Sequence, residues 1–488
     1  MRKTALLLFV LFIATAGAQT SPDFDLYFAG GALRLEFFQT GDSDEEIISP
    51  GQICREPVWP GSRDNLIDHF NNGRYGIKVY DIATNALIYS SGFDCMYGEY
   101  RTTTPALEGI KRTFRRAVRF PQPKRPVNFV LEKRDQNNLP APLFLQKIDP
   151  ADYHINTEPA QTGELYESHI SGNPAGMADL LFIAEGYTAA EKQKFEADVD
   201  KMRDFLFTIS PYREMKEKLN LRGLFIASPE SGMDEPRQGS YKNTLLNASF
   251  NAFDLDRYML VDDGHLLRRI AGQAPYDAIV VLVNSTRYGG GGIYNDYAIT
   301  TVDHAMSRRV FVHEFGHSFG GLGDEYYTSD VAYNDFYPKG IEPLEPNITA
   351  LLDPEHIKWA ELLSPGVSLP TDYGREMLDS LQASRRENGQ AMEKALRTAK
   401  EKGASEKELE KIRKPYLDKS KKIDSALAAQ RKKYEHLADR VGAFEGAGYS
   451  ARGLYRPMMD CLMISNNRDR FCKVCEAAIA CMIGHYAR

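Results

Sequence analysis

The sequence predicts a multidomain protein with an N-terminal all-β sandwich, followed by an α/β domain that carries a charged helical-hairpin insertion. A chain of 488 residues is too long for one hydrophobic core. Short apolar or alternating segments separated by turn residues fill the first third of the chain. Strand and helix patterns alternate from about residue 175, which is typical of a mostly parallel sheet covered by helices.

The overall composition excludes some classes of partner. The hydrophobic fraction of 43% and the charged fraction of 26% are those of an ordinary globular protein. The net charge of −7 provides no basic field, so we expect no nucleic-acid partner. After the first 20 residues no stretch approaches 18 apolar residues, so no membrane span is expected in the mature chain.

The first residues have the pattern of a targeting segment. Arg2 and Lys3 precede an apolar run from Ala5 to Ala14, and Ala16-Gly17-Ala18 is a small-residue cleavage site. The run is too short to cross a bilayer comfortably. We therefore predict a signal peptide over residues 1–18 and export to the periplasm, the cell surface or the medium.

Residues 19–160 are predicted to form the β-sandwich, as an accessory domain. Its apolar or alternating runs begin near Ala32, Gly76, Ala86 and Val127, and no His, Cys or carboxylate cluster of ligand spacing lies among them. We expect this domain to support or present the chemistry of another region. A glycine- and polar-rich linker over residues 161–174 is expected to close it.

The second domain is predicted to span residues 175–488. Buried strands are expected near residues 179–184, 221–227 and 277–284, with helices over about 188–209 and 253–270. The four glycines at 289–292 are interpreted as a flexible bend that leads into an edge strand over Tyr297–Thr301. An extended peptide could pair with such an edge through its backbone.

A His-Glu-x-x-His motif carries the strongest chemical signal in the chain. On a helix from about residue 305 to 319, His313 and His317 are one turn apart and share a face, so both imidazoles can bind one Zn²⁺ ion. Glu314 is the next residue along and can accept a proton from the metal-bound water.

The glycines that follow this helix are expected to return a third ligand to the metal. Gly320 and Gly321 can end the helix, since glycine readily takes the left-handed conformation. The first candidate ligand after that turn is Asp324, and Glu325 is the fallback or a carboxylate behind the ligands.

Residues 375–440 are predicted to be a helical-hairpin insertion. They hold 18 Lys or Arg residues and 12 Asp or Glu residues, a net charge of +6. Gly403 interrupts the helical pattern and Ser405-x-x-Glu408 restarts it as a capping box. Because acidic residues are interspersed throughout, we expect solvated helices rather than a nucleic-acid or membrane surface.

The six cysteines allow two interpretations. An exported protein can hold disulfides, and Cys54 and Cys95 are separated in sequence from the other four. The C-terminal group could alternatively bind a structural zinc ion, because Cys472-x-x-Cys475 has ligand spacing. We expect disulfides, of unassigned connectivity, among Cys54, Cys95, Cys461, Cys472, Cys475 and Cys481.

Several motifs together resemble the IgA peptidase family of zinc metallopeptidases, which is metzincin-like. They are Glu185-Gly186-Tyr187, Tyr288-Gly289-Gly290, His313 to Tyr326, Gly446-Ala447-Gly448-Tyr449, and Cys461-x-Met463 with Cys472-x-x-Cys475. The resemblance implies a metzincin-like catalytic domain in which His313 and His317 bind zinc and Glu314 is the general base. It also implies that Met463 lies beneath the metal. Where metzincins have their third ligand this chain has Gly323, so the neighbouring Asp324 is the expected ligand.

The function expected from these residues is that of an exported zinc-dependent endopeptidase that hydrolyses peptide bonds in protein substrates. Tyr288, Tyr449 and Tyr455 are candidates for contacts to the oxyanion or the substrate, and the sequence does not choose among them. Two alternatives remain: a cell-surface binding or adhesion module on a metallopeptidase scaffold, and a zinc-dependent hydrolase of a non-protein amide. The zinc motif excludes neither of them.

Overall fold

A computed structural model describes residues 21–158, 162–327, 336–465 and 468–487. The signal peptide predicted over residues 1–18 lies outside the described residues. In the described part of the chain, no helix is both long enough and apolar enough to cross a membrane.

The N-terminal region is β-rich, as predicted, and is built from two antiparallel sheets. One sheet has the order β2-β1-β5, with β1 at Phe28–Gly41, β2 at Glu46–Glu56 and β5 at Arg112–Pro123. The other has the order β4-β3-β6-β7, with β3 at Tyr75–Asp81, β4 at Leu87–Phe93, β6 at Val127–Arg134 and β7 at Pro140–Ile148. Buried side chains join the two sheets: Phe120 of β5 stacks on Phe129 of β6 with ring centroids 5.7 Å apart. Three short helices lie beside these strands: α1 (Phe24–Tyr27), α2 (Met96–Tyr100) and α3 (Thr104–Leu107).

The C-terminal region is a mixed α/β domain around a six-stranded sheet of order β12-β13-β11-β9-β10-β8. The four inner strands, β9 (Ala178–Glu185), β10 (Leu219–Phe225), β11 (Ala278–Val283) and β13 (Tyr297–Thr301), run parallel to one another. These strands are buried on both faces, which explains their nearly continuous apolar sequences.

The two outermost strands of this sheet differ from the sequence-based interpretation. Residues 164–169, predicted as linker, form strand β8 (Glu164–His169), which pairs antiparallel with β10. The segment was misassigned because an exposed edge strand needs only weak apolar character. At the other edge, the predicted glycine bend is strand β12 (Gly290–Ile293), so β13 is an inner strand.

The prediction of a helix over residues 253–270 was also partly wrong. The helix α5 covers only Gly264–Ala271 and begins at Asp263, whose side chain accepts a hydrogen bond from the Leu266 amide. The preceding residues contain Phe253 with a φ of 50°, a left-handed conformation that no helix interior tolerates. Apolar residues at helical spacing suggested a longer helix than the backbone forms.

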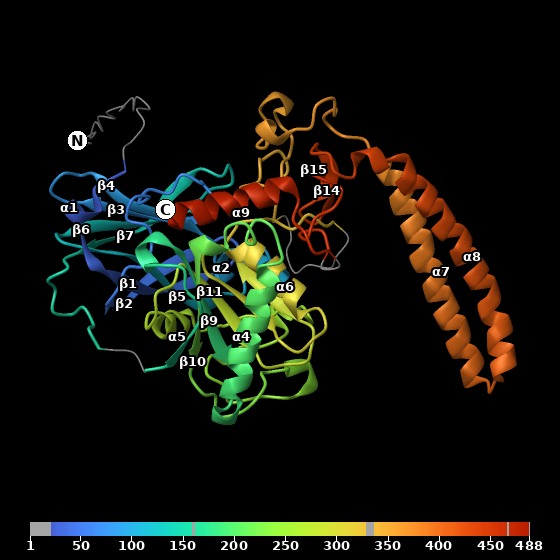
Figure 1. The fold of residues 1–488 in the computed structure, drawn as a ribbon, viewed down its shortest axis with the longest axis horizontal. Coiled ribbons are helices and arrows are strands. Elements are labelled where there is room, and N and C mark those ends of the chain that lie inside the picture. Colours follow the sequence, from blue (N-terminus) through green and yellow to red (C-terminus); the bar gives the residue numbers. More distant parts are fainter. Residues whose placement is uncertain (1–20, 159–161, 328–335, 466–467, 488) are drawn as a thin grey trace, which may run out of the picture.

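Alternate residues of the central strands face two different cores. On one face, Leu181 and Ile183 of β9 belong to the core that contains the N-terminal sheets and α5. On the other face, Leu180 and Phe182 pack with α4 (Lys192–Leu206), α6 (Ser307–Ser318) and α9 (Lys473–Tyr486). The N-terminal strands therefore cover one side of the six-stranded sheet (Figure 1).

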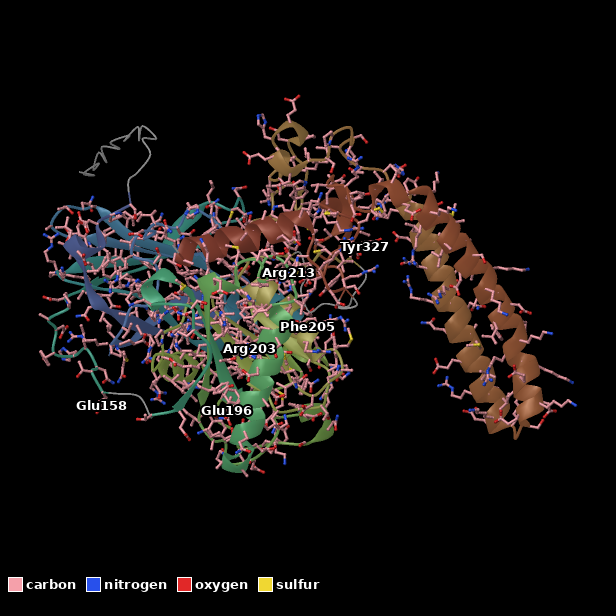
Figure 2. The ribbon with its side chains drawn as sticks, in the orientation of Figure 1. Glu158, Glu196, Arg203, Phe205, Arg213 and Tyr327 are labelled. Atoms are coloured by element: carbon pink, nitrogen blue, oxygen red, sulfur yellow. The ribbon has the colours of Figure 1, made fainter. Side chains whose placement is uncertain are left out.

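The segment predicted as a charged hairpin forms two long helices, α7 (Arg375–Glu401) and α8 (Glu406–Lys433), which pack against each other. They project away from the rest of the protein (Figure 1), and α7, with 27 residues, is about 40 Å long. Tyr327, labelled in Figure 2, lies near their base and donates a 2.7 Å hydrogen bond to Asp379 of α7. The chain returns from them through the hairpin of β14 (Phe444–Ala447) and β15 (Ser450–Arg456).

Candidate active site

The helix α6 places His313 and His317 side by side, as predicted. Their ring centroids are 4.8 Å apart and their Nε2 atoms are 3.2 Å apart. His313 donates from Nδ1 to the carbonyl of Leu462 at 3.1 Å, and His317 donates from Nδ1 to the carbonyl of Leu322 at 2.6 Å. These bonds hold each proton on Nδ1, so both Nε2 lone pairs are available to a metal.

The glycine turn that follows has the predicted function of reversing the chain. Gly321 has a φ of 63°, its amide donates to the His317 carbonyl, and the Leu322 amide donates to the Gly316 carbonyl. Gly323 packs so closely that a Cβ atom there would lie 2.5 Å from Ile348. A side chain at position 323 would have to displace Ile348 and the hydroxyl of Tyr337, and the neighbouring Asp324 supplies the carboxylate instead.

Asp324 lies directly between the two histidines. Its Oδ1 is 3.1 Å from His313 Nε2 and 3.3 Å from His317 Nε2, and the side chain is buried. Nitrogen and oxygen ligands about 2.0–2.1 Å from a tetrahedral zinc ion lie about 3.3 Å from one another. The three observed separations, between 3.1 and 3.3 Å, therefore match one face of a zinc tetrahedron.

Glu314 lies beside this triangle, against the glycine-rich strand. A Cβ on Gly290 would be 2.9 Å from Glu314 Oε1, and a Cβ on Gly292 would be 2.3 Å from the Glu314 carbonyl oxygen. The glycines are thus required for the close approach of β12 to the active-site helix. The approach to the helix explains Gly290 and Gly292, and the equally close Met259 explains Gly289 and Gly291, so close packing rather than flexibility accounts for the glycine run.

The surroundings of Glu314 and Asp324 shift the pKa values of these two carboxyl groups in opposite directions. Burial raises the pKa of Glu314, and Asp324 adds to this effect, although the two imidazoles oppose it. Burial also acts to raise the pKa of Asp324, but the adjacent imidazoles in their protonated form outweigh it and hold that pKa well below the ordinary range. Asp324 is therefore the stronger acid of the two, and Glu314 is the weaker.

The site opens into a cleft of about 1140 Å³ that includes space open to solvent. The N-terminal region supplies one wall of this cleft, including Arg74, Asp94 and Glu99. Arg74 forms ion pairs with Asp94 at 3.2 Å and with Glu345 at 3.0 Å, and its guanidinium lies 4.0 Å from the ring centroid of Phe336. The accessory region thus contributes to the site directly.

The three candidate tyrosines occupy different positions. Tyr449 lines the cleft and donates a 2.6 Å hydrogen bond to Asp324 Oδ2. Tyr288 also lines the cleft, with its ring against His304. Tyr455 does not belong with them, because it lies on β15, where its backbone pairs with Thr349 and its ring packs on the hydrophobic core. It is not among the residues that line the cleft.

Met463 is buried beneath the active-site helix. Its sulfur would be 3.0 Å from a Cβ built on Gly316, which lies between the two histidines. Its nearby competitors lie elsewhere: Met458 contacts the start of α9, and Met459 packs near the helix pair. Its predicted position under the metal stays a prediction.

Sequence reasoning missed Arg257, which lines the cleft. Burial acts to lower its pKa, but Tyr326, Tyr288 and Glu314 outweigh that effect and raise it. The side chain of Asn347 was also missed; it bonds both the amide and the carbonyl of Gly323 and so fixes the turn before Asp324. No motif marks either residue, because each reaches the site from a loop that is distant in sequence.

The disulfide prediction is not met in this structure, where all six cysteines are free. Cys95 donates to Gln39 at 3.5 Å, and Cys54 lies beside Arg34 on the neighbouring strand, so each is buried with a different partner. Cys481 is exposed on α9. The remaining cysteines, Cys461, Cys472 and Cys475, gather around Glu325.

Two imidazoles and a carboxylate that converge beside a glutamate, at a cleft in a mixed α/β domain, define a metal-dependent hydrolase. Comparison with family models makes this assignment more specific. Residues 167–483 match the model described as IgA Peptidase M64, and residues 23–144 match the one described as Peptidase M64 N-terminus. The chain therefore belongs to the IgA peptidase M64 family of metallopeptidases. No match was found among curated proteins.

Proposed function

We propose that this protein is an exported zinc-dependent endopeptidase. The observation that carries the proposal is the triangle formed by His313 Nε2, His317 Nε2 and Asp324 Oδ1, with sides of 3.1–3.3 Å. Two nitrogen donors and one oxygen donor that leave an open position are a catalytic zinc ligand set. Asp324 Oδ1 is buried without a hydrogen-bond donor in the described structure, which is consistent with a cation at this point.

In the proposed mechanism, bound zinc would polarise the scissile carbonyl and lower the pKa of a water molecule. Glu314 accepts a proton from that water on its carboxylate and then donates it to the leaving amine. The raised pKa of Glu314 suits a group that must both take and return a proton.

The other residues of the site act by positioning. The carbonyls of Leu462 and Leu322 fix the two imidazole rings, and Tyr449 orients Asp324 through its hydroxyl. Arg257 and Tyr288 lie on the cleft wall and are candidates for contacts to the substrate carbonyl or the developing oxyanion. We also propose a metzincin-like domain with Met463 beneath the metal.

The substrate we propose is a protein or peptide, as membership of a peptidase family implies. The cleft lies between the catalytic helix, the edge strand β12 and the N-terminal region, so a chain bound there would contact both regions. Pairing with β12 would be limited, because Tyr258 already bridges Gly290 at that edge. Export is proposed from the N-terminal pattern at Arg2, Lys3 and the apolar run.

A mixed peptide library offered to the purified protein tests this proposal. We expect cleavage that is abolished by a chelator, restored by zinc, and lost in Glu314→Ala. Glu355→Ala, on the exposed surface, is the control and should cleave like the unmodified protein. Cleavage that survives both the chelator and the Glu314 substitution would contradict the zinc-peptidase mechanism.

The two alternative functions, a binding or adhesion module and a hydrolase of a non-protein amide, predict different results in these experiments. For a binding or adhesion module, Glu314→Ala would leave the biological activity unchanged. For a hydrolase of a non-protein amide, no library peptide would be cut, yet chelator-sensitive hydrolysis of cell-wall amides would be found.

A further inference from the structure

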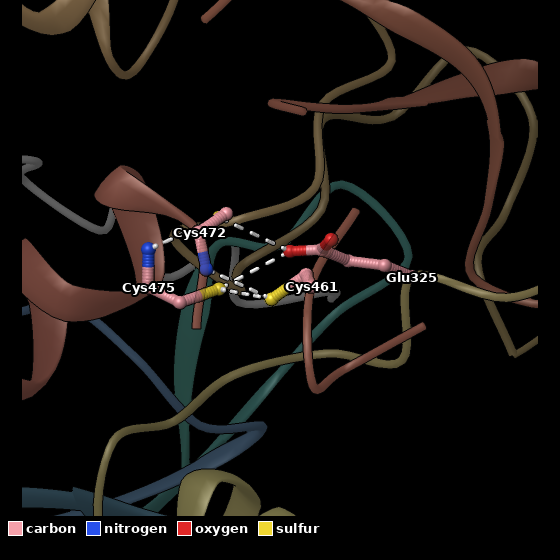
Figure 3. Close-up of side chains that lie close together, drawn as sticks. All are labelled: Glu325, Cys461, Cys472 and Cys475. Atoms are coloured by element: carbon pink, nitrogen blue, oxygen red, sulfur yellow. Dashed lines mark hydrogen bonds between the residues drawn. The ribbon is translucent and has the colours of Figure 1, made fainter. Parts of the chain in front are cut away.

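A second cluster of metal-binding side chains lies apart from the His-Asp triangle. Glu325, Cys461, Cys472 and Cys475 come from three segments and point toward one another (Figure 3). One ligand atom from each lies within 4.8 Å of all the others. None of these residues is more than 2% exposed.

The spacing of these atoms corresponds to a tetrahedral metal site. The sulfurs of Cys461 and Cys475 are 3.8 Å apart, whereas sulfurs joined in a disulfide are about 2.05 Å apart. Two thiolates about 2.3 Å from a tetrahedral zinc ion are separated by about 3.8 Å. Glu325 Oε1 lies 3.7 Å from the sulfur of Cys472 and 3.1 Å from that of Cys475, near the roughly 3.6 Å expected of a mixed oxygen and sulfur pair.

Glu325 presents a buried carboxyl group whose oxygen atoms a cation could bind. Glu325 is 0% exposed, and no basic residue of the described chain forms an ion pair with it. Asn347 donates to its Oε1 at 2.9 Å, but its Oε2 has no hydrogen-bond partner within the part of the chain that the structure describes. A buried carboxylate without compensation is strongly unfavourable. A disulfide would supply no charge and would leave one of the three thiols over.

Backbone amides donate hydrogen bonds to two of the three sulfurs in the cluster. Cys461 Sγ accepts from the amides of Cys472 at 3.1 Å and Met463 at 3.4 Å. Cys472 precedes the 14-residue helix α9, and its sulfur accepts from the Cys475 amide at 3.5 Å. Amide donors and the positive end of a helix stabilise the deprotonated sulfur that metals bind.

We propose that Glu325, Cys461, Cys472 and Cys475 bind a second zinc ion, which has a structural function. Four protein ligands in a closed, buried site are the arrangement of structural zinc, and three sulfurs favour zinc over magnesium or calcium. The site does not require that the protein be a peptidase.

This second zinc would hold together segments that build the catalytic site. Glu325 is adjacent to Asp324 in the chain, and its amide donates to the Met463 carbonyl at 3.0 Å. Cys461 precedes Leu462, whose carbonyl orients His313. The proposed zinc therefore fixes the turn that carries the third catalytic ligand to the loop that supports the first.

Metal content of the full-length protein tests this inference. We expect about two zinc ions per chain, and about one in Cys475→Ser and in the double variant His313→Ala, His317→Ala, each having lost a different ion. Cys481→Ser is the matched control, because Cys481 lies on the same helix but outside the cluster, and it should retain both ions. Wild-type protein with a single zinc that the His variant loses would overturn the proposal.

Cobalt replacement provides a test that does not depend on folding of a cysteine variant. With Co²⁺ in place of zinc, the unmodified chain and the His313→Ala, His317→Ala variant should both show thiolate-to-cobalt charge-transfer absorption. The intact mass of the non-reduced protein should be that of six free thiols. Absence of the absorption, or a mass lower by the two hydrogens of a Cys461–Cys475 disulfide, would overturn the second site while leaving the peptidase proposal intact.

Discussion

Two neighbouring carboxylates in this protein face different clusters. Asp324 turns toward His313 and His317, whereas Glu325 turns toward three cysteines. The first cluster offers three ligand atoms beside a cleft, and the second offers four ligand atoms without access to solvent. Three ligands beside a cleft leave a metal with an open position for a substrate. Four ligands in a closed site leave no such position, so a metal there can only stabilise the fold.

The surroundings of the two clusters also differ in their exposure to solvent. His317 and Glu314 are partly exposed along the cleft, next to Tyr449 and Arg257. The cysteine cluster is enclosed by the start of α9 and by the loop before it. We call the group of His313, His317 and Asp324 the open cluster, and the group of Glu325 and the three cysteines the sealed cluster. The open cluster should exchange its metal readily. The sealed cluster should release its metal only when the structure opens.

Graded chelation should show the largest difference between the clusters. A chelator should first remove the open-site metal and abolish cleavage, with little change in the melting temperature. Removal of the sealed-site metal should then destabilise the protein by several kcal/mol, since binding to a structural zinc site contributes about 10 kcal/mol or more. Activity, metal content and thermal unfolding measured in parallel would check this order; simultaneous loss of both metals would contradict it.

Substitution of each adjacent carboxylate should affect one cluster alone. Asp324→Asn should weaken zinc at the open site by more than the roughly 10–100-fold that loss of an outer partner costs, while the thiolate-to-cobalt absorption persists. Glu325→Gln should weaken the sealed site and lower the melting temperature. Equilibrium dialysis against zinc measures both effects. Equal loss at both sites from either substitution would show that the clusters are not separate.

The hydroxyl of Tyr449 should affect the open cluster only. Tyr449→Phe removes the 2.6 Å hydrogen bond to Asp324 Oδ2, so we expect zinc affinity at that site to fall about 10–100-fold. Tyr455→Phe is the matched control and should bind zinc normally, since that ring packs on the core. A competition assay with a chromophoric chelator gives the affinities, and equal effects of the two substitutions would refute this function of Tyr449.

The smallest effects are expected from substituting single glycines, Gly292 and Gly389, and concern the free energy of unfolding. Gly292→Ala would place a Cβ 2.3 Å from the carbonyl of Glu314, so we expect a loss of about 1–3 kcal/mol in unfolding free energy and reduced cleavage. Gly389→Ala, in α7 with no atom within 4 Å of the added carbon, should instead stabilise the protein by up to about 1 kcal/mol. Urea unfolding compares the two variants, and an unimpaired Gly292→Ala would show that β12 can move away.

The parts of the site that follow from local periodicity were predictable from sequence. The helical spacing of His313 and His317, the left-handed glycine at 321 and the carboxylates after it lie within one short stretch. The two-region organisation was predictable too, because the hydrophobic pattern changes where the N-terminal strands end.

The remaining features depend on contacts that no local pattern encodes. Arg74 and Arg257 reach the cleft from other segments, and the wall supplied by the N-terminal region follows from a shared core. The glycine run was interpreted as flexible because glycine has two uses, free rotation and close approach, which only the neighbouring atoms distinguish. Disulfides were expected only because an exported protein occupies an oxidising compartment. The buried carboxylate of Glu325 among the cysteines could not be foreseen from the sequence.

The dependence of the active-site helix on residues far along the chain has a consequence during synthesis. The Leu462 carbonyl that orients His313 is 149 positions further along, and Tyr449 is 125 positions after Asp324. A ribosome-bound chain that has not yet released these residues cannot assemble the complete catalytic geometry. Long-range closure of this kind is slow, so the protein would become competent for hydrolysis only after the segment that contains Tyr449 and Leu462 has been synthesised and has folded back onto the helix.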